Sequence, residues 1–226
     1  MGMGEEFHQV LNKGFVRLID TMGNDMSVVR SARVSYGNET KGEEADKKLI
    51  NYLIKHNHGT PFEHLNFTFH IKAPIFIARQ WFRHRIGSFN EISGRYVKLD
   101  LDFWSPEEWR INDRENLQSS SFKELSPIEV NELNSSLEQT YKYISITYDY
   151  LINQGVAREQ ARTILPVGTY TEFYWTVNAR SLFNFIKLRT HQSAQKEIQD
   201  YGNIIYDIAK ETAPWTFEAF EKHILS

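Results

Sequence analysis

Cysteine is absent from this chain of 226 residues. The absence excludes disulfide bonds, thiolate metal sites, iron–sulfur clusters and any mechanism that begins with a cysteine nucleophile. A covalent step in this protein would therefore need another side chain or a cofactor.

Long apolar runs and a large net charge are also missing. The longest stretch without Asp, Glu, Lys or Arg is nine residues, from Thr163 to Thr171, whereas a membrane-spanning helix needs roughly 20 apolar residues. Lys plus Arg number 26 and Asp plus Glu number 29, for a net charge of −3. The first residues lack the basic and apolar regions of a signal peptide. We therefore expect a cytoplasmic protein with no membrane partner.

Aromatic residues, in contrast, are abundant and make up 14% of the chain, with 15 Phe, 11 Tyr and 5 Trp. They could form an aromatic core, stack on flat ring ligands, or do both. Composition leaves this choice open. No repeat or linker divides the sequence, so we predict a single α+β domain over residues 1–226, with a few-stranded sheet packed against several helices.

Hydrophobic periodicity and capping residues predict the elements of this domain. Strict alternation predicts strands at 65–72 and 171–177, and shorter apolar runs predict strands at 14–19 and 95–99. Helices are expected at 25–36, from about residue 45 to near 59, and at 74–85, 126–155, 178–189 and 194–210, with a shorter one ending at 165. Residues 87–94 read as a loop between two glycines, and residues 100–125 as polar and irregular.

The most unusual segment is 79–95, in which four arginines and one histidine accompany a single carboxylate, although the chain as a whole is slightly acidic. Arginine presents a planar, permanently charged fork that suits phosphate. On a helix, Arg79 and Arg83 would lie one turn apart, with Gln80 and His84 beside them. The segment therefore predicts a pocket for a phosphorylated ligand.

The residues alone leave other interpretations open. The segment could be a solvated basic helix end or part of a nucleic-acid surface, although the net charge and the absence of lysine argue against the second. Histidines at 56, 58, 64 and 70 raise the question of a metal, but their spacing fits no HExxH motif, and we predict no metal site. Ser88 lies four residues after His84, yet no Gly-x-Ser-x-Gly elbow surrounds it.

A second polar set follows the strand predicted at 171–177. It comprises Asn178, Ala179, Arg180, Asn184, Arg189, Gln195 and Glu197, with Arg162 in the helix before that strand. Each could be a surface or capping residue by itself. Together they repeat the first arrangement, in which an aromatic strand leads through a turn to a helix that ends in arginine. The two sets could face each other across one cleft or across a subunit boundary.

The pattern Arg83-His84-Arg85-x-x-Ser88-x-Asn90-Glu91-x-Ser93-x-Arg95 resembles the signature of flavin-dependent thymidylate synthases. The similarity extends over nearly the whole chain and is weakest in residues 100–125. It includes Asn24-Asp25, Arg33-Val34-Ser35, His58-x-Thr60-Pro61-Phe62-Glu63-His64, Trp175-Thr176-Val177-Asn178-Ala179-Arg180-Ser181 and Pro214-Trp215-Thr216-Phe217-Glu218-Ala219-Phe220.

The resemblance implies a homotetramer of α/β subunits with active sites between subunits. The family converts dUMP to dTMP with 5,10-methylenetetrahydrofolate as carbon donor, bound FAD as redox carrier and NADPH as reductant. Matching positions imply FAD contacts from Thr60, Arg83, His84, Arg85, Glu91, Asn178, Ala179, Arg180 and Asn184. They imply dUMP contacts from Gln80, Arg83, Glu91, Ser93, Gly94, Arg95, Arg162 and Arg189. His191 and Ser193 stand where some members carry Asp and His, so neither is included.

The resemblance also gives the missing cysteine a meaning. Carbon 5 of uracil is a weak nucleophile, which cysteine-dependent thymidylate synthases enhance by adding a thiolate to carbon 6. Without a thiolate, the remaining route is to stabilise negative charge that develops on the pyrimidine. Arg189 resembles the family arginine in this role, while reduced flavin supplies the hydride. Ser88 as the nucleophile is the competing mechanism, and an unactivated hydroxyl is poorly suited to it.

Overall fold

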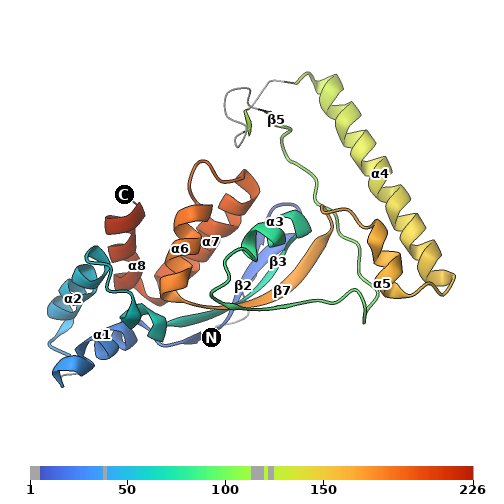
Figure 1. Ribbon diagram of the computed structural model, residues 1–226. Coiled ribbons are helices and arrows are strands. Elements are labelled where there is room, and N and C mark those ends of the chain that lie inside the picture. Colours follow the sequence, from blue (N-terminus) through green and yellow to red (C-terminus); the bar gives the residue numbers. More distant parts are fainter. Residues whose placement is uncertain (1–5, 38–39, 113–119, 122–124, 226) are drawn as a thin grey trace.

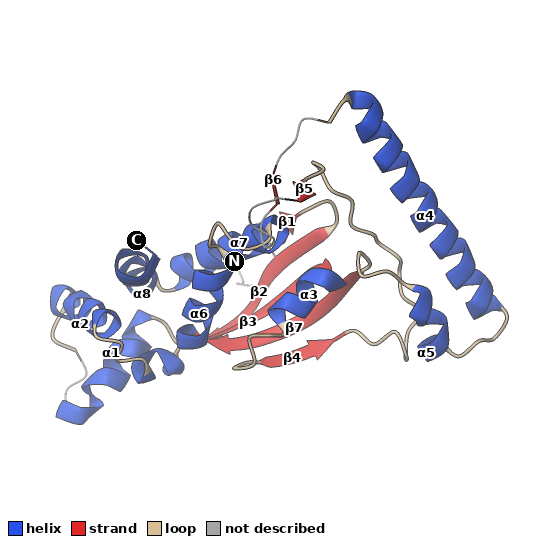
Figure 2. Ribbon diagram, turned by 45° about the horizontal axis from the view of Figure 1, so that its top comes forward, coloured by secondary structure: helices blue, strands red, loops and turns tan. Residues whose placement is uncertain are grey.

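The computed structural model describes residues 6–37, 40–112, 120–121 and 125–225. Its centre is a five-stranded antiparallel sheet in the order β1-β2-β3-β7-β4 (Figure 2). The strands are β1 (His8–Val10), β2 (Gly14–Met22), β3 (Asn66–Pro74), β7 (Tyr170–Asn178) and β4 (Ser88–Glu91). The edge strand β4 belongs to the arginine-rich signature, so this motif is anchored to the sheet.

The two central strands owe their pairing to matched alternation. Phe69 of β3 lies opposite Trp175 of β7, and Ile71 lies opposite Phe173. These side chains share one sheet face and are fully or almost fully buried. Because side chains alternate between the two faces of a strand, His70 and Lys72 of β3 and Glu172 of β7 face the other way.

Helices from the two halves of the chain cover this aromatic face. They are α3 (Ile75–Trp81), α6 (Ala179–Arg189), α7 (Lys196–Thr212) and α8 (Pro214–Phe220), which is followed by the π-helical turn η4 (Glu221–Leu225) (Figures 1 and 2). Trp81 of α3 lies 5.4 Å from Trp175 and 4.7 Å from Phe185 of α6, measured between ring centroids. Much of the aromatic content therefore forms the core beneath α3 and α6.

One end of the sheet carries the α1–α2 region. It consists of α1 (Asp25–Arg33), the 3₁₀ turn η1 (Val34–Tyr36), α2 (Glu43–Lys55) and the 3₁₀ turn η2 (Thr60–His64). Asn24 caps α1 through a bond from the Met26 amide. Arg33 and Asp46 form a buried ion pair with a nitrogen–oxygen distance of 2.5 Å, which joins the two helices.

The opposite end carries a long helix, α4 (Pro127–Asn153), which stands away from the sheet like an arm (Figure 1). Ser126 and Glu129 form its capping box. The helix α5 (Arg158–Ala161) and the 3₁₀ turn η3 (Arg162–Ile164) lead back to β7, and the strands β5 (Ile111–Asn112) and β6 (Ser120–Ser121) pair with each other. Within the described residues of α4, only Tyr148 is buried.

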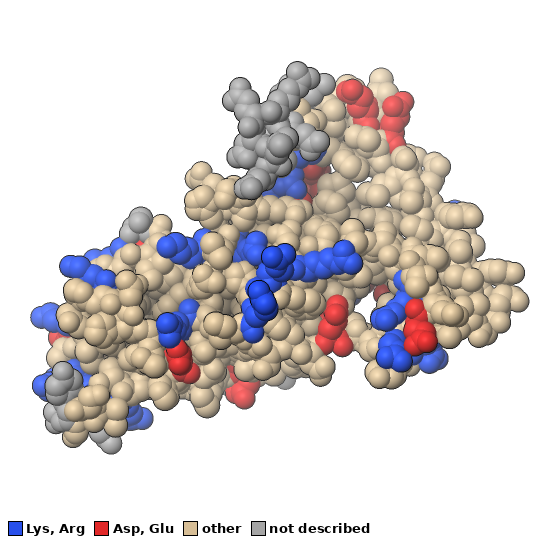
Figure 3. Space-filling view, viewed as in Figure 1, with Lys and Arg blue, Asp and Glu red and all other residues tan. Residues whose placement is uncertain are grey.

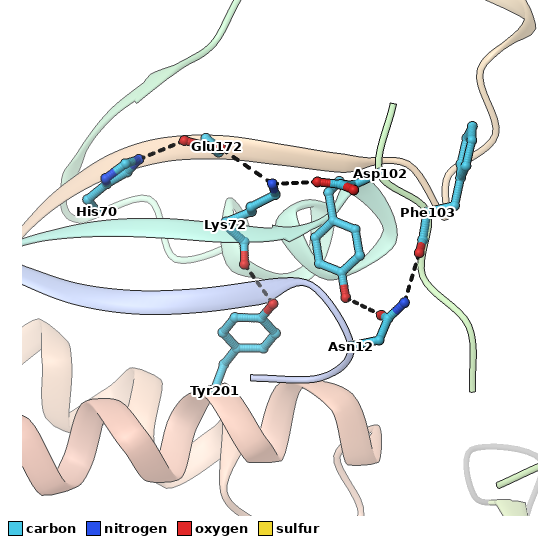
Figure 4. A network of polar contacts seen from close by, with 8 residues as sticks. Asn12, His70, Lys72, Asp102, Phe103, Glu172 and Tyr201 are labelled. Carbon is cyan, nitrogen blue, oxygen red and sulfur yellow. Dashed lines mark hydrogen bonds and ion pairs between the residues drawn. The ribbon is translucent and has the colours of Figure 1, made fainter. Parts of the chain in front are cut away.

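Polar contacts join the sheet to the segment that contains Asp102 and Phe103 (Figure 4). Lys72 of β3 pairs with Asp102 at 2.7 Å and with Glu172 of β7 at 3.7 Å. The hydroxyl of Tyr201 in α7 donates to the Lys72 carbonyl at 2.7 Å. Gly14 at the start of β2 permits this approach, because a Cβ there would lie 2.0 Å from that hydroxyl.

The predicted α+β class is confirmed, but three predictions in and just after the signature were wrong. The helix expected at 74–85 ends at Trp81, and the loop expected at 87–94 contains β4. Residues 95–99 form no strand. The physical reason is the edge of β7, whose backbone groups pair with residues 88–91. The single-domain assignment stays a prediction. No helix in the described part of the chain combines the length and apolar character that a membrane span requires.

Candidate active site

The signature residues leave the α3 helix in a tight turn and then enter β4. The Phe82 amide still bonds to the Ala78 carbonyl, and the His84 amide bonds to the Trp81 carbonyl at 2.9 Å. Because Trp81 is fully buried, the turn begins from a fixed point in the core. Arg83 and Arg85 are exposed, whereas His84 is partly buried. The one-turn spacing predicted for Arg79 and Arg83 is not formed, since the helix has already ended.

Arg189 is the last residue of α6 and meets this turn directly. Its Nε donates to Nε2 of His84 at 3.0 Å, and its Nη2 donates to the Gln80 carbonyl at 3.1 Å. Burial, and secondly the positive charge of Arg83, lower the pKa of Arg189. Burial and the charge of Arg189 lower the pKa of His84 to about 4. The structure therefore places a neutral histidine beside two arginines.

Gln80 and Gln195 extend this group, which we call the Arg189 cluster: Gln80, Arg83, His84, Arg189 and Gln195. The Gln80 Nε2 donates to Gln195 Oε1 at 2.6 Å. In the following loop the His191 Nδ1 and the Ser193 hydroxyl lie 2.8 Å apart and bond to each other. Arg85 belongs to the same turn as the cluster but has no contact with it among the described hydrogen bonds.

A second group, the Gly94 group, forms where the signature ends: Glu91, Ser93, Gly94, Arg95 and Arg162. A Cβ on Gly94 would lie 3.2 Å from the Arg162 side chain, so η3 packs against this glycine. Arg95 pairs with Glu159 at 3.1 Å, and its amide donates to the Ser93 hydroxyl. The Glu91 carboxylate accepts a bond from Thr171 at 2.7 Å. Five predicted nucleotide-binding residues thus lie where the chain after β4 meets α5 and η3.

A third group surrounds a pocket of about 250 Å³ between α2, η2 and α6. Arg180 and Asn184 line it, together with His58 and Lys187. Arg180 also pairs with Glu63 at 2.6 Å. We call this space the Arg180 pocket. Thr60 is exposed; it is the first residue of η2 and directly follows Gly59, which lines the pocket.

Two predicted flavin contacts have structural tasks in this chain. The Asn178 side chain accepts from the Ser181 amide at 2.9 Å and caps α6, as its position predicted. Ala179 is fully buried, and its amide donates to the Leu65 carbonyl at 2.8 Å. These contacts fix the start of the helix that carries Arg180, Asn184 and Arg189. A direct flavin contact from either residue stays a prediction.

Three residues that share these groups were not among the site residues predicted from the sequence. His58 and Lys187 line the Arg180 pocket, and Gln195 belongs to the Arg189 cluster. Lys187 had a signal, because spacings of four and seven residues put Asn184 and Lys187 on the same helix face as Arg180. Gln195 was named in the second polar set, but the sequence carried no signal for its bond to Gln80, because the two residues are 115 positions apart.

Several of the cations here lack a carboxylate partner. None of the ion pairs between described residues includes Arg79, Arg83, Arg85, Arg162, Lys187 or Arg189. A band of Lys and Arg side chains crosses the face of the molecule over α3 and α6 (Figure 3). Unneutralised guanidinium groups gathered in this way favour anionic ligands.

Two alternatives find no support in the contacts. Within the part of the chain that the structure describes, no three His, Asp or Glu side chains are arranged to hold a metal ion. Ser88 is exposed on β4 opposite Thr176, and no described hydrogen bond joins it to His84. No hydrogen bond between described residues therefore gives this serine the activating base that a nucleophile needs.

Comparisons with known proteins agree with this geometry. The family model described as "Thymidylate synthase complementing protein" matches residues 17–215. The chain is 53% identical to the flavin-dependent thymidylate synthase of Thermosipho africanus, with 95% of this chain and 94% of the relative covered. It is 48% identical to that of Thermus thermophilus, with 96% and 78% covered.

Solved structures give the same result. The chain is similar to the UMP/dUMP methylase PolB from Streptomyces cacaoi bound with 5-Br UMP, with a TM-score of 0.85 and 33% identity over 95% of this chain and 96% of that chain. The same enzyme bound with 5-Br dUMP gives a TM-score of 0.85 and 32% identity, over 95% and 97% of the two chains.

Proposed function

The chain belongs to the family of flavin-dependent thymidylate synthases, and from this membership we propose that it methylates dUMP to dTMP with FAD, 5,10-methylenetetrahydrofolate and NADPH. The observation that carries the proposal is the Arg189 cluster. It holds a guanidinium in place with two uncharged acceptors and with no described carboxylate partner. Such a group can stabilise an anion that forms next to it.

The residues fit the bound flavin that this proposal needs. FAD carries a pyrophosphate, and the Arg180 pocket offers Arg180 and Lys187 along one helix face with the Asn184 amide between them. The pocket also has apolar walls from Phe62 and Phe183. We assign FAD contacts to Thr60, Arg83, His84, Arg85, Glu91, Asn178, Ala179, Arg180 and Asn184. When bound, FAD supplies hydride transfer between NADPH and the transferred carbon.

The Gly94 group fits the phosphate of dUMP. Gly94 lets the Arg162 side chain lie close to the backbone, and Arg95 adds a second positive charge next to it in sequence. Arg162 has no carboxylate partner among the described residues. Arg95 pairs only with the half-exposed Glu159, and an exposed pair of this kind contributes little and can exchange for phosphate. We assign dUMP contacts to Gln80, Arg83, Glu91, Ser93, Gly94, Arg95, Arg162 and Arg189.

Arg189 performs the activating step in this proposal. Its guanidinium favours the pyrimidine form in which negative charge has developed, and this makes carbon 5 a better nucleophile without a covalent bond to the protein. Burial strengthens the effect, because a charge interacts more strongly where water is excluded. The sequence has no cysteine that could act instead.

We further propose a homotetramer with active sites between subunits, each subunit being one domain over residues 1–226. No hydrogen bond or ion pair between described residues joins the three site groups on one chain. Exposed apolar side chains on α4 support an interface there: Tyr143 is 72% exposed and Tyr150 is 60% exposed. A cytoplasmic location goes with this proposal, because its substrates are charged metabolites that do not cross membranes freely.

Product analysis tests the function. Purified protein reconstituted with FAD should form dTMP from dUMP only when methylenetetrahydrofolate and NADPH are both present, as measured by chromatography and mass spectrometry. A parallel reaction with UMP measures selectivity, since PolB is described as a UMP/dUMP methylase. No dTMP from protein with full flavin occupancy would disprove the proposal.

A further inference from the structure

The bond between Arg189 and His84 fixes the protonation of the histidine. Arg189 Nε lies 3.0 Å from His84 Nε2, and a guanidinium Nε always carries its hydrogen. The imidazole nitrogen must therefore accept, and a doubly protonated ring could not occupy this position. The neutral ring then carries its proton on Nδ1.

The core of the protein holds this imidazole in place. Its ring lies edge to face against Phe185, with 5.0 Å between ring centroids and an angle of 69°. Phe185 and Trp81 are both fully buried, and the Trp81 carbonyl accepts the His84 amide at 2.9 Å. The histidine therefore depends on no ligand for its orientation.

Both acceptors that face Arg189 are uncharged. The second is the Gln80 carbonyl, 3.1 Å from Nη2. A carboxylate in either place would orient the guanidinium equally well but would neutralise its charge. Two N–H groups of Arg189 donate to these acceptors, and no hydrogen bond between described residues uses the others.

We propose that His84 is a positioning residue, whose Nδ1-protonated ring orients the Arg189 guanidinium through Nε2 and leaves its positive charge undiminished. The inference rests on the proposed function, in which that charge activates the pyrimidine. It is distinct from a flavin contact, which would use the Nδ1–H. That group has no hydrogen-bond partner among the described residues.

The charges around His84 agree with a neutral ring. Arg189 approaches from α6, and Arg83 precedes His84 in the same turn. Both are positive, so neither would stabilise a positive charge on the imidazole. Burial and Arg189 lower the pKa of His84 to about 4, so the ring stays neutral at pH 7.

Two substitutions of similar chemistry separate positioning from packing. In His84→Gln, the amide oxygen can reach the place of Nε2 and still accept from Arg189. In His84→Asn, the shorter side chain puts its oxygen near the place of Nδ1. At saturating dUMP and with flavin occupancy measured by absorbance, we expect kcat to fall less than about fivefold for Gln and roughly 10- to 100-fold for Asn. Equal losses in the two variants would contradict positioning.

A double-mutant cycle tests whether His84 acts through Arg189. Arg189→Lys keeps a charge but lacks Nε and should retain measurable turnover. In that background His84→Asn should lower kcat by less than about threefold, because the bond it breaks is already gone. A loss as large as in the wild-type background would overturn the inference.

Nitrogen-15 NMR of histidine-labelled, FAD-loaded protein reads the protonation state directly, and the signal of His84 is identified by its loss in His84→Gln. We expect proton coupling at Nδ1, none at Nε2, and no titration between pH 6 and pH 8. A proton on Nε2 in a protein that makes dTMP would overturn the positioning role alone. Failure to form dTMP would overturn the proposed function, and the positioning role with it.

Discussion

At the scale of single residues, the arginines assigned to the ligands include two kinds, those with a carboxylate partner and those without one among the described residues. Arg95 and Arg180 have carboxylate partners, and their side chains are more than half exposed. Arg83, Arg162 and Arg189 have no carboxylate partner among the described residues. Exposed pairs contribute little to stability, so a phosphate can replace the carboxylate at small cost. An arginine without a carboxylate partner has no ion pair to break, so it contributes more free energy to the binding of an anionic ligand.

Two matched substitutions test how these arginines are divided between ligands. Arg162→Gln should weaken dUMP binding by roughly 10- to 100-fold and leave FAD binding almost unchanged, because a charge-assisted hydrogen bond to phosphate is lost. Arg180→Gln should have the reverse effect. Titration calorimetry with each ligand measures both constants. Equal weakening of both ligands by both variants would contradict the separate assignments.

The sequence predicted which residue types gather at the site but not how they meet. Four arginines close to one histidine in a slightly acidic chain already indicated anion binding. The bond from Arg189 to His84 could not be predicted, because the two residues are 105 positions apart and meet only after α6 packs on α3. The protonation of His84 follows from that contact alone.

At the scale of elements, local signals predicted the caps of two helices correctly, whereas the pairing of β4 was missed. Asn178 caps α6 and Ser126 caps α4, because a capping bond depends on the next three residues. The strand β4 was missed because its four residues carry a weak pattern, and its pairing partner β7 lies more than 80 positions later. The motif is therefore more rigid than a loop between two glycines.

The buried pair of Arg33 and Asp46 gives a prediction for the α1–α2 region. Asp46→Asn should lower the free energy of unfolding by about 3 kcal/mol, because it leaves Arg33 buried without its counter-charge. Asp149→Asn removes the partner of Lys98 in an exposed pair and should change it by less than about 1 kcal/mol. Urea unfolding at pH 7 measures both.

The same pair makes stability depend on pH in a defined direction. Burial raises the pKa of Asp46, but bonds from Thr40, Arg33 and the Lys41 amide outweigh it, so the pKa is lowered. A lowered folded-state pKa means that the contribution is present above the ordinary value of 3.8 and is lost as the pH falls below it. Wild type should lose this contribution below about pH 4, and Asp46→Asn should not. Parallel losses in acid would contradict this cause.

At the scale of the whole molecule, the arm formed by α4 has a different kind of surface from the rest of the protein. The sheet and its helices carry the basic band and the three site groups, whereas α4 carries exposed apolar side chains (Figures 1 and 3). Periodicity predicted the length of α4 correctly. It could not predict that Tyr143, Ile146 and Tyr150 of this helix would remain exposed on the chain, because an apolar residue looks the same in sequence whether its packing partner is internal or external.

The central claim is that charge on Arg189, rather than a nucleophile, activates the substrate. The most direct measurement compares dTMP formation by Arg189→Ala and Ser88→Ala proteins, both loaded with FAD and shown to bind dUMP. Arg189→Ala should keep its flavin and lose turnover by at least roughly 100-fold, while Ser88→Ala should stay within about tenfold of wild type. Near-normal turnover of Arg189→Ala, together with complete loss in Ser88→Ala, would contradict the account.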